Sequence, residues 1–181
     1  MSAIISPRGQ YRYRLDREVP RDRPVKGSLV FAYFGVNPST ADASIDDATV
    51  RKWRGFGKRW GATRFIVGNA FAYRATDVRA LATVQAVGPE NDRYLAQIIA
   101  EADILVPCWG DRGKVPTHLR ERFDAVLAVL RASGKPVVTF GLTKGGDPKH
   151  PLMLSYKTQL IPWRAEGNRT PIGGDRNIEG K

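Results

Sequence analysis

Apolar residues along this chain fall in continuous runs that alternate with stretches of helical spacing. The runs predict buried strands over residues 28–36, 63–71, 104–110 and 135–142, because unbroken apolar runs of this length are typical of strands covered on both faces. The intervening pattern predicts helices over 46–61, 90–103 and 116–134, with a short helical turn at 78–82. This alternation predicts an α/β fold, a three-layer α/β/α sandwich with a mainly parallel four-stranded central sheet.

The two ends of the chain differ from this middle part. Residues 10–19 alternate between apolar and polar, which predicts an edge strand or hairpin within a basic N-terminal segment, 1–27. The single α/β domain is expected over 28–163. Residues 164–181 are polar and glycine-rich, which predicts a flexible tail.

The first predicted helix carries clear boundary signals. Asp46 or Asp47 is a plausible N-cap, and Gly61 is a plausible C-terminal stop. The apolar side chains between them, Trp53 included, are expected to face the core.

Ligands of open α/β sheets bind beyond the carboxyl ends of the strands, so the residues that leave each strand are the candidates for a site. The predicted loops converge there, and they carry amides, hydroxyls, charges and aromatic rings. The candidate binding residues are Gly35, Pro38, Ser39, Thr40, Asn69, Phe71, Tyr73, Arg74, Trp109, Thr143 and Lys144. The candidate catalytic residues are Asn37, Asp42, Asp47 and His150.

These residue types suit a planar heterocycle with a phosphate nearby. An asparagine amide offers donors and an acceptor that can read a base edge. Phe71, Tyr73 or Trp109 could stack on the ring, and Lys144 and Arg74 could hold a phosphate. Neither a G-x-G-x-x-G motif nor a Walker A loop follows the first strand.

Each candidate also has a structural interpretation. Asn37 before Pro38 is also a common turn former, and Asn69 could cap a loop. Asp46 and Asp47 could serve only as helix caps. Trp109 could belong to the core, and His150 with the proline after it could form an ordinary turn.

The charge and composition of the chain favour certain classes of binding partner. The net charge of +11 and a pI near 10.2 favour nucleic acid, DNA in preference to RNA, or a nucleotide; the alternative is a solvated basic surface. Residues 7–26 mix arginines with two tyrosines, which suits phosphate contact with base stacking, or else a surface hairpin. One cysteine and two histidines predict no metal and no cofactor. Without a long apolar stretch or a leader, we expect a cytoplasmic monomer that does not enter a membrane.

Several segments resemble a bacterial and phage domain family of unknown function whose hallmark is N-P-S-T-A-D. They lie between residues 28 and 163 and include "GVNPSTAD", "VGNAFAYRATD", "GPEND", "GLTKGGDPKHPL" and "LIPW". A more distant resemblance is to the uracil-DNA glycosylase superfamily. Gly35-Val36-Asn37-Pro38 resembles the first active-site loop of its mismatch-specific branch, Asn69 matches in place an asparagine that reads the uracil edge, and His150-Pro151 resembles the superfamily's last motif. Ser39 and Leu152 depart from the usual residues of those motifs.

This second resemblance implies an enzyme that hydrolyses the N-glycosidic bond of a damaged or modified base. It implies that Asn37 places the attacking water, that Asn69 reads the base and that His150 stabilises the departing base. Asp42 or Asp47 could polarise the water, and Phe71 could stack. Two alternatives stay open: a non-catalytic nucleic-acid-binding module on the same fold, and an enzyme acting on free nucleotides or nucleosides.

Overall fold

The computed structural model describes residues 1–21, 27–39 and 45–163. Their strands are β1 (Ser2–Ile5), β2 (Arg12–Glu18), β3 (Val30–Gly35), β4 (Arg64–Asn69), β5 (Ile104–Pro107), β6 (Val138–Thr139) and β7 (Ile161–Pro162). The α-helices are α1 (Ala48–Trp60), α2 (Asn91–Glu101) and α3 (Glu121–Ala132), and three short 3-10 turns are η1 (Val78–Thr83), η2 (Arg112–Lys114) and η3 (Thr117–Leu119). The predicted flexible tail, 164–181, lies outside the described residues.

The central sheet is mixed, so the prediction of a mainly parallel four-stranded sheet is wrong. The sheet has five strands in the order β1-β2-β4-β3-β5. β4, β3 and β5 are parallel, whereas β2 pairs antiparallel with β4 and β1 pairs antiparallel with β2. The strand expected at the edge over 10–19 therefore lies one place inside it, because the first residues of the chain supply β1 as a further strand.

The segment expected as the fourth parallel strand, 135–142, does not join this sheet as a strand. It touches β5 through one parallel bridge between Leu105 and Val137. At Val138 it becomes β6 and pairs antiparallel with β7 in a separate two-stranded sheet. The partner strand lies more than twenty residues downstream, and apolar periodicity does not report such a distant pairing.

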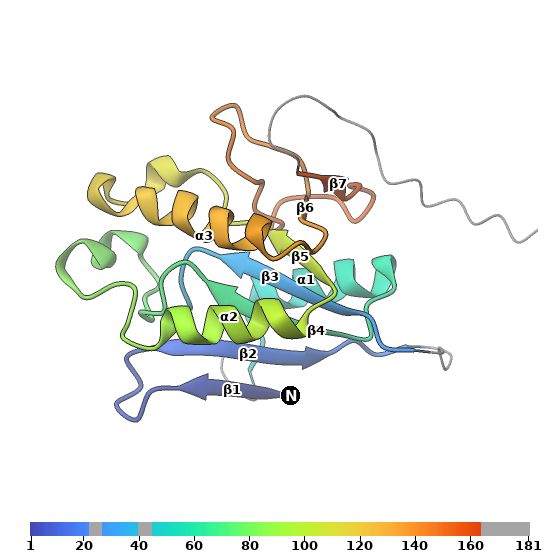
Figure 1. The fold of residues 1–181 in the computed structure, drawn as a ribbon, viewed down its shortest axis with the longest axis horizontal. Helices are drawn as coiled ribbons and strands as arrows, with labels where there is room; N and C mark the ends of the chain where they lie inside the picture. The colour runs from blue at the N-terminus through green and yellow to red at the C-terminus, as the bar shows by residue number, and fades with distance from the viewer. Residues whose placement is uncertain (22–26, 40–44, 164–181) are drawn as a thin grey trace, which may run out of the picture.

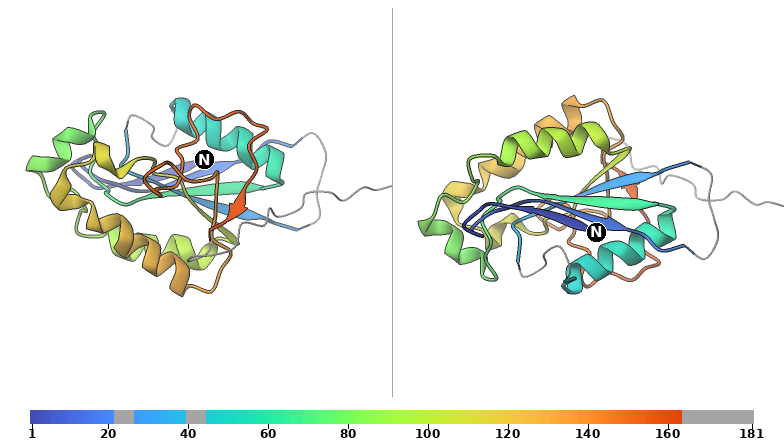
Figure 2. Two further views of the ribbon diagram at one scale, coloured as in Figure 1. Left: turned by 90° about the horizontal axis from the view of Figure 1, so that it is seen from above. Right: turned by 90° about the horizontal axis from the view of Figure 1, so that it is seen from below.

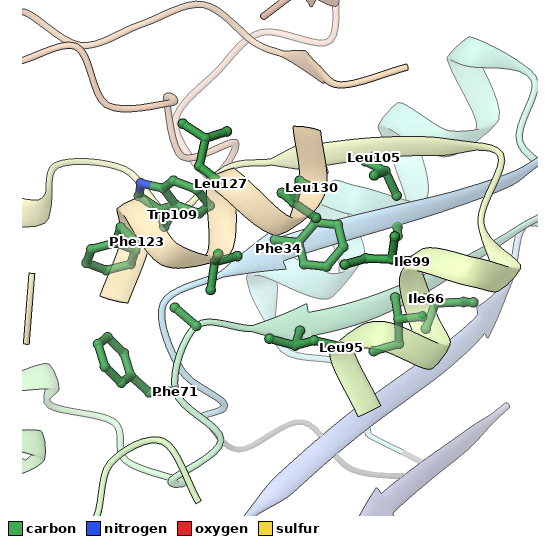
Figure 3. Packing of buried hydrophobic residues seen from close by; sticks show 14 of the residues in the cluster. Phe34, Ile66, Phe71, Leu95, Ile99, Leu105, Trp109, Phe123, Leu127 and Leu130 are labelled. Atoms are coloured by element: carbon green, nitrogen blue, oxygen red, sulfur yellow. The ribbon is translucent and has the colours of Figure 1, made fainter. Parts of the chain in front are cut away.

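Helices cover both faces of the central sheet. α2 and α3 lie on one face and α1 lies on the other (Figures 1 and 2). On the face covered by α2 and α3, Phe34 of β3 packs with Ile66 of β4 and Leu95 of α2, as Figure 3 shows. The preceding residue, Tyr33, packs with Trp53 of α1 on the other face. Because neighbouring residues of β3 are buried on opposite faces, the whole strand reads as one apolar run.

The predicted helix boundaries agree closely with α1. Asp47 is its N-cap and accepts a hydrogen bond from the Val50 amide, and Gly61 ends the helix with a φ of 84°, in the left-handed region that glycine adopts readily. The helix predicted over 116–134 is interrupted near its start, where η3 precedes α3. Within the described residues, no helix combines the length and the apolarity needed to cross a bilayer.

Candidate functional site

A cavity of about 190 Å³ with both polar and apolar lining residues lies at the carboxyl ends of β3 and β4. The start of α1 and the loop that carries His150 close it from other sides. Its lining contains six predicted site residues: Gly35, Asn37, Ser39, Asp47, Asn69 and His150. The other residues around it are Arg12, Val36, Thr49, Trp53, Ala75, Thr76 and Val78.

Asn69 places a buried amide in this cavity. It is the last residue of β4, its exposed fraction is 3%, and its Nδ2 has no hydrogen-bond partner among the described residues. Gly35 lies beside it in register on β3, and a Cβ added to Gly35 would come within 2.9 Å of Asn69 Oδ1. A glycine at the end of β3 therefore provides the space in which the Asn69 amide sits.

Side chains of α2 and α3 hold the backbone at the end of β4 by hydrogen bonds. Asn91, in the first turn of α2, donates from its Nδ2 to the carbonyls of Asn69 and Ala70, each at 3.1 Å. Arg122 of α3 also donates to the Ala70 carbonyl, at 3.0 Å. These bonds fix the strand end, so the Asn69 side chain projects from a rigid support.

Asn37 fastens the two neighbouring loops to each other. Its Nδ2 donates to the carbonyls of Pro38, Tyr73 and Ala75, at 3.1, 3.4 and 2.7 Å. The amide is thereby fixed in orientation, and its Oδ1 is the atom left to accept a hydrogen bond in the cavity.

The two aspartates before α1 have different tasks. Asp46 is ion-paired to Arg17 at 2.6 Å and to Arg54 at 2.7 Å. Asp47 lines the cavity, while its Oδ1 caps α1 through the Val50 amide at 2.8 Å. The Asp46 carboxylate is therefore engaged in structural ion pairs, and the Asp47 carboxylate brings negative charge to the cavity.

His150 reaches the cavity from the opposite loop. Burial lowers its pKa below the ordinary value of 6.5, the positive charge of Lys114 lowers it further, and the negative charge of Asp47 opposes both effects. Its Nδ1 accepts a hydrogen bond from the Leu152 amide at 3.3 Å. The ring is therefore neutral near pH 7 and carries its proton on Nε2, where it can act as a donor.

Arg12 enters the cavity because β2 contains a β-bulge. Ile4 pairs with Arg14, but the next residue of β1, Ile5, pairs with Arg12, so Tyr13 is the extra residue. Tyr13 and Arg14 consequently both contact α2, whereas Arg12 turns to the α1 face and is 3% exposed. A bulge commonly re-aims a side chain beside a site, and the residue pattern of 10–19 contains no sign of it.

Trp53 supplies an aromatic wall that the sequence placed only in the core. Its ring stacks on Tyr33 at a centroid distance of 5.5 Å, and its indole Nε1 donates to Cys108 Sγ at 3.3 Å. Burial raises the pKa of the Cys108 thiol to about 12, so this thiol is protonated and unreactive near pH 7. The signal that could have identified Trp53 is its place in the first two turns of the helix that follows the first polar loop.

The remaining candidates lie away from the cavity lining. Phe71 and Trp109 are core residues that both pack on Phe123. Tyr73 packs edge-on against Tyr11, and Arg74 donates to the Gly9 carbonyl. The others are Pro38, which is buried in the first loop, and Thr143 and Lys144, in the turn that the bridge between Leu142 and Pro148 closes. Thr40 and Asp42 lie outside the described residues.

The part of the chain that the structure describes holds no group of three or more acidic, histidine or cysteine side chains arranged for a metal ion. The cavity instead presents amides, hydroxyls, one carboxylate, one neutral imidazole and one guanidinium. Such a set suits a small polar ring, because convergent hydrogen-bonding groups fix the orientation of a ligand.

The fold and the cavity define an α/β protein whose site lies at the carboxyl ends of adjacent parallel strands, where sheets of this kind bind small ligands. Within this class, the chain belongs to the family described as "Protein of unknown function (DUF1643)", whose model matches residues 12–152. The predicted membership of a family of unknown function is thereby confirmed. No curated protein and no solved structure matches the chain.

Proposed function

We propose that the cavity binds a single nucleobase and that the protein hydrolyses the N-glycosidic bond of a damaged or modified base. The observation that carries the proposal is the Asn69 amide, which is buried in the cavity with an unpartnered Nδ2. A buried donor without a partner costs about 1–3 kcal/mol. A base carbonyl oxygen would supply the missing acceptor, and Asn69 Oδ1 could accept from a ring N–H.

The size of the cavity supports one ring as the ligand. Its volume of about 190 Å³ is below the ~300–1,000 Å³ of pockets that hold drug-sized molecules. The Trp53 ring forms part of the wall, beside hydrogen-bonding groups. An entire nucleotide would exceed this space, which favours a base whose sugar and phosphate stay outside.

The chain's own groups could perform the hydrolysis without a cofactor. Asn37 Oδ1 would orient a water molecule, and Asp47 would accept its proton as the water oxygen bonds to the sugar carbon C1′. The C1′–N bond breaks and its electron pair leaves with the base. His150 Nε2–H and Asn69 Nδ2–H would stabilise the resulting negative charge. The base then takes a proton from solvent, and Asp47 releases one to solvent.

The basic surface would supply the affinity for the nucleic acid that carries the base. A net charge of +11 favours contacts with phosphates that are independent of sequence. The target base would have to leave the stack, at a cost of a few kcal/mol, and this cost is smallest in single strands and at lesions.

A base-binding module without chemistry is the second candidate. The engagement of Asn37 favours it, because this amide already donates to three backbone carbonyls. In that case the same cavity would hold a base, and Asn69 would still be required for binding.

The test is an excision assay on single- and double-stranded oligonucleotides that carry uracil, hypoxanthine, xanthine or modified pyrimidines. We expect wild type to produce abasic sites and Asn69→Ala to be slower by a factor of about 100 or more, as when an oriented donor is removed from an active site. Because the Asn69 Nδ2 has no partner to lose, this variant should keep the melting temperature of wild type.

A His150→Gln variant should also be slow, whereas His118→Gln, which changes an exposed histidine outside the cavity lining, should match wild type. Equal rates in wild type and Asn69→Ala would contradict the proposal. If no substrate gives a product but a base still binds in a way that depends on Asn69, the binding-module alternative would replace the proposed hydrolysis.

A further inference from the structure

A second cavity, of about 450 Å³, lies at the end of the β1–β2 hairpin, against the start of α2. We call this cavity the tyrosine groove; its apolar and aromatic lining includes Ile4, Ile5, Tyr11, Tyr13, Pro89 and Tyr94. It is larger than the site cavity, and it shares no lining residue with it.

The three tyrosine rings form one aromatic wall. Tyr13 is 5% exposed and lies between the other two, with ring centroids 5.9 Å from Tyr11 and 5.1 Å from Tyr94. The interplanar angles are 14° and 15°, so the rings are nearly parallel. Tyr11 and Tyr94 are half-buried and keep part of their surface open to the groove. A flat ring from a ligand would extend such a row by stacking.

The charge at the groove favours an anionic ligand. Its acidic residue, Glu90, is already paired with Arg93 at 2.6 Å, and the Arg93 guanidinium also lies 4.6 Å from the Tyr94 ring centroid. Arg8 lines the groove, is exposed and forms no ion pair with a described residue. Proteins that bind single-stranded nucleic acid combine aromatic rings, on which the bases stack, with cations that pair with the phosphates.

The groove lies beside α2 and the site cavity lies beside α1, and consecutive residues at the start of β2 line the two. The bulge sends Arg12 into the site cavity and its neighbours Tyr11 and Tyr13 into the groove. The backbone at Tyr11 bridges to Tyr73, and the Ala75 that follows two residues later lines the site cavity. In Figure 1 the hairpin turn and the loop that contains η1 lie at the same end of the sheet.

We propose that the tyrosine groove binds unpaired bases of single-stranded nucleic acid next to the nucleotide whose base enters the site cavity. The choice of nucleic acid over another aromatic ligand rests on the proposed function and on the basic charge of the chain. The groove would contribute affinity and leave the chemical step unchanged, since none of its lining residues also lines the site cavity.

The test measures binding of a fluorescein-labelled oligothymidylate of about 10 nucleotides, within the ~4–16 nucleotides that such sites cover. The variants are Tyr94→Leu, which keeps apolar bulk but loses the ring, and Tyr94→Phe, which keeps the ring. Tyr156→Leu is the control, because Tyr156 also keeps ring surface open to solvent and also lies beside a cation, Lys52, but belongs to the α1 face.

We expect the dissociation constant to rise at least about fivefold in Tyr94→Leu, the lower bound for loss of one base–aromatic stack. Tyr94→Phe and Tyr156→Leu should bind as wild type does. Wild-type affinity in Tyr94→Leu would overturn the proposal, because the groove would then act only as an apolar surface or not at all. An absence of oligothymidylate binding by wild type would overturn it as well.

The same variants separate this proposal from the proposed function. Tyr94→Leu should keep the wild-type excision rate at saturating substrate, and it should weaken oligothymidylate binding by the same factor in an Asn69→Ala background as in wild type. Oligothymidylate binding that depends on the Tyr94 ring, without any abasic product, would support the groove proposal and contradict the proposed glycosidase activity. Excision that depends on Asn69, together with oligothymidylate binding that is unchanged in Tyr94→Leu, would remove the groove and keep the glycosidase activity.

Discussion

At the scale of single residues, Asn69 and His150 present donors that the fold itself does not use. The Asn69 Nδ2 is buried without a partner, and the His150 Nδ1 is occupied by the Leu152 amide, which leaves Nε2–H to the cavity. Two donors that line the same cavity can together stabilise one developing negative charge. The proposed binding of a base rests on this pairing more than on any single motif.

His150 should make stability depend on pH. Its pKa is lowered in the folded state, so below about pH 6.5 the unfolded state binds more protons than the folded state. The stability that His150 contributes is therefore present above this pH and is lost as the pH falls through the folded-state value. Denaturant unfolding of His150→Gln between about pH 7 and 5 should show a smaller loss than wild type.

The exposed His118 gives the control for this measurement. A His118→Gln variant should follow the wild-type dependence on pH. Parallel curves for wild type and His150→Gln would mean that His150 titrates alike in the folded and unfolded states, and would contradict the neutral, buried imidazole on which its role as donor depends.

The cavity brings together some of the residues that the sequence predicted for a site, but not all of them. Asn37, Asp47, Asn69 and His150 follow or flank predicted strand ends, and the cavity brings them together. Phe71 has the right position in the chain, yet it is buried against Phe123, because the direction of a side chain after a strand depends on packing that periodicity does not encode.

At the scale of elements, α1 connects stability to the site through its N-cap. Asp47→Asn keeps an oxygen that can accept from the Val50 amide, so the free energy of unfolding should change by only a few tenths of a kcal/mol. Asp47→Ala loses this bond and should cost about 1 kcal/mol. Urea denaturation measures both effects.

The excision rate of the same pair tests the carboxylate. Both variants should be slow, because both lack the negative charge that would accept a proton from water. Full activity in Asp47→Asn would show that Asp47 serves the helix alone, as one interpretation of the sequence holds.

The bulge in β2 shows what an alternating pattern hides. Residues 10–19 predict a regular strand, and a regular strand would place Arg12 and Arg14 on the same face. The extra residue sends Arg12 to the cavity while Arg14 stays with Glu101 of α2 at 2.6 Å. A bulge is set by pairing with another strand, so single-strand periodicity cannot reveal it.

At the scale of the whole molecule, the sequence predicted the α/β class and the positions of most helices and strands, but not the sheet. The three parallel strands β4, β3 and β5 bring Gly35 and Asn69 to one edge, as the alternation implied. The added strand β1, the inward place of β2 and the departure of β6 to pair with β7 depend on contacts between distant segments. Those contacts decide which loops meet at the cavity.

The central claim is that the Asn69 amide receives a nucleobase, and side-chain amide NMR tests it most directly. Protein labelled with ¹⁵N at asparagine would be titrated with free uracil, hypoxanthine and xanthine, and the Asn69 signal would be identified by its absence in Asn69→Ala. The account predicts a saturable shift of the Asn69 Nδ2 resonances with at least one base, because a base oxygen completes the missing hydrogen bond. An Asn69 signal that stays unchanged at every concentration of all three bases would contradict it.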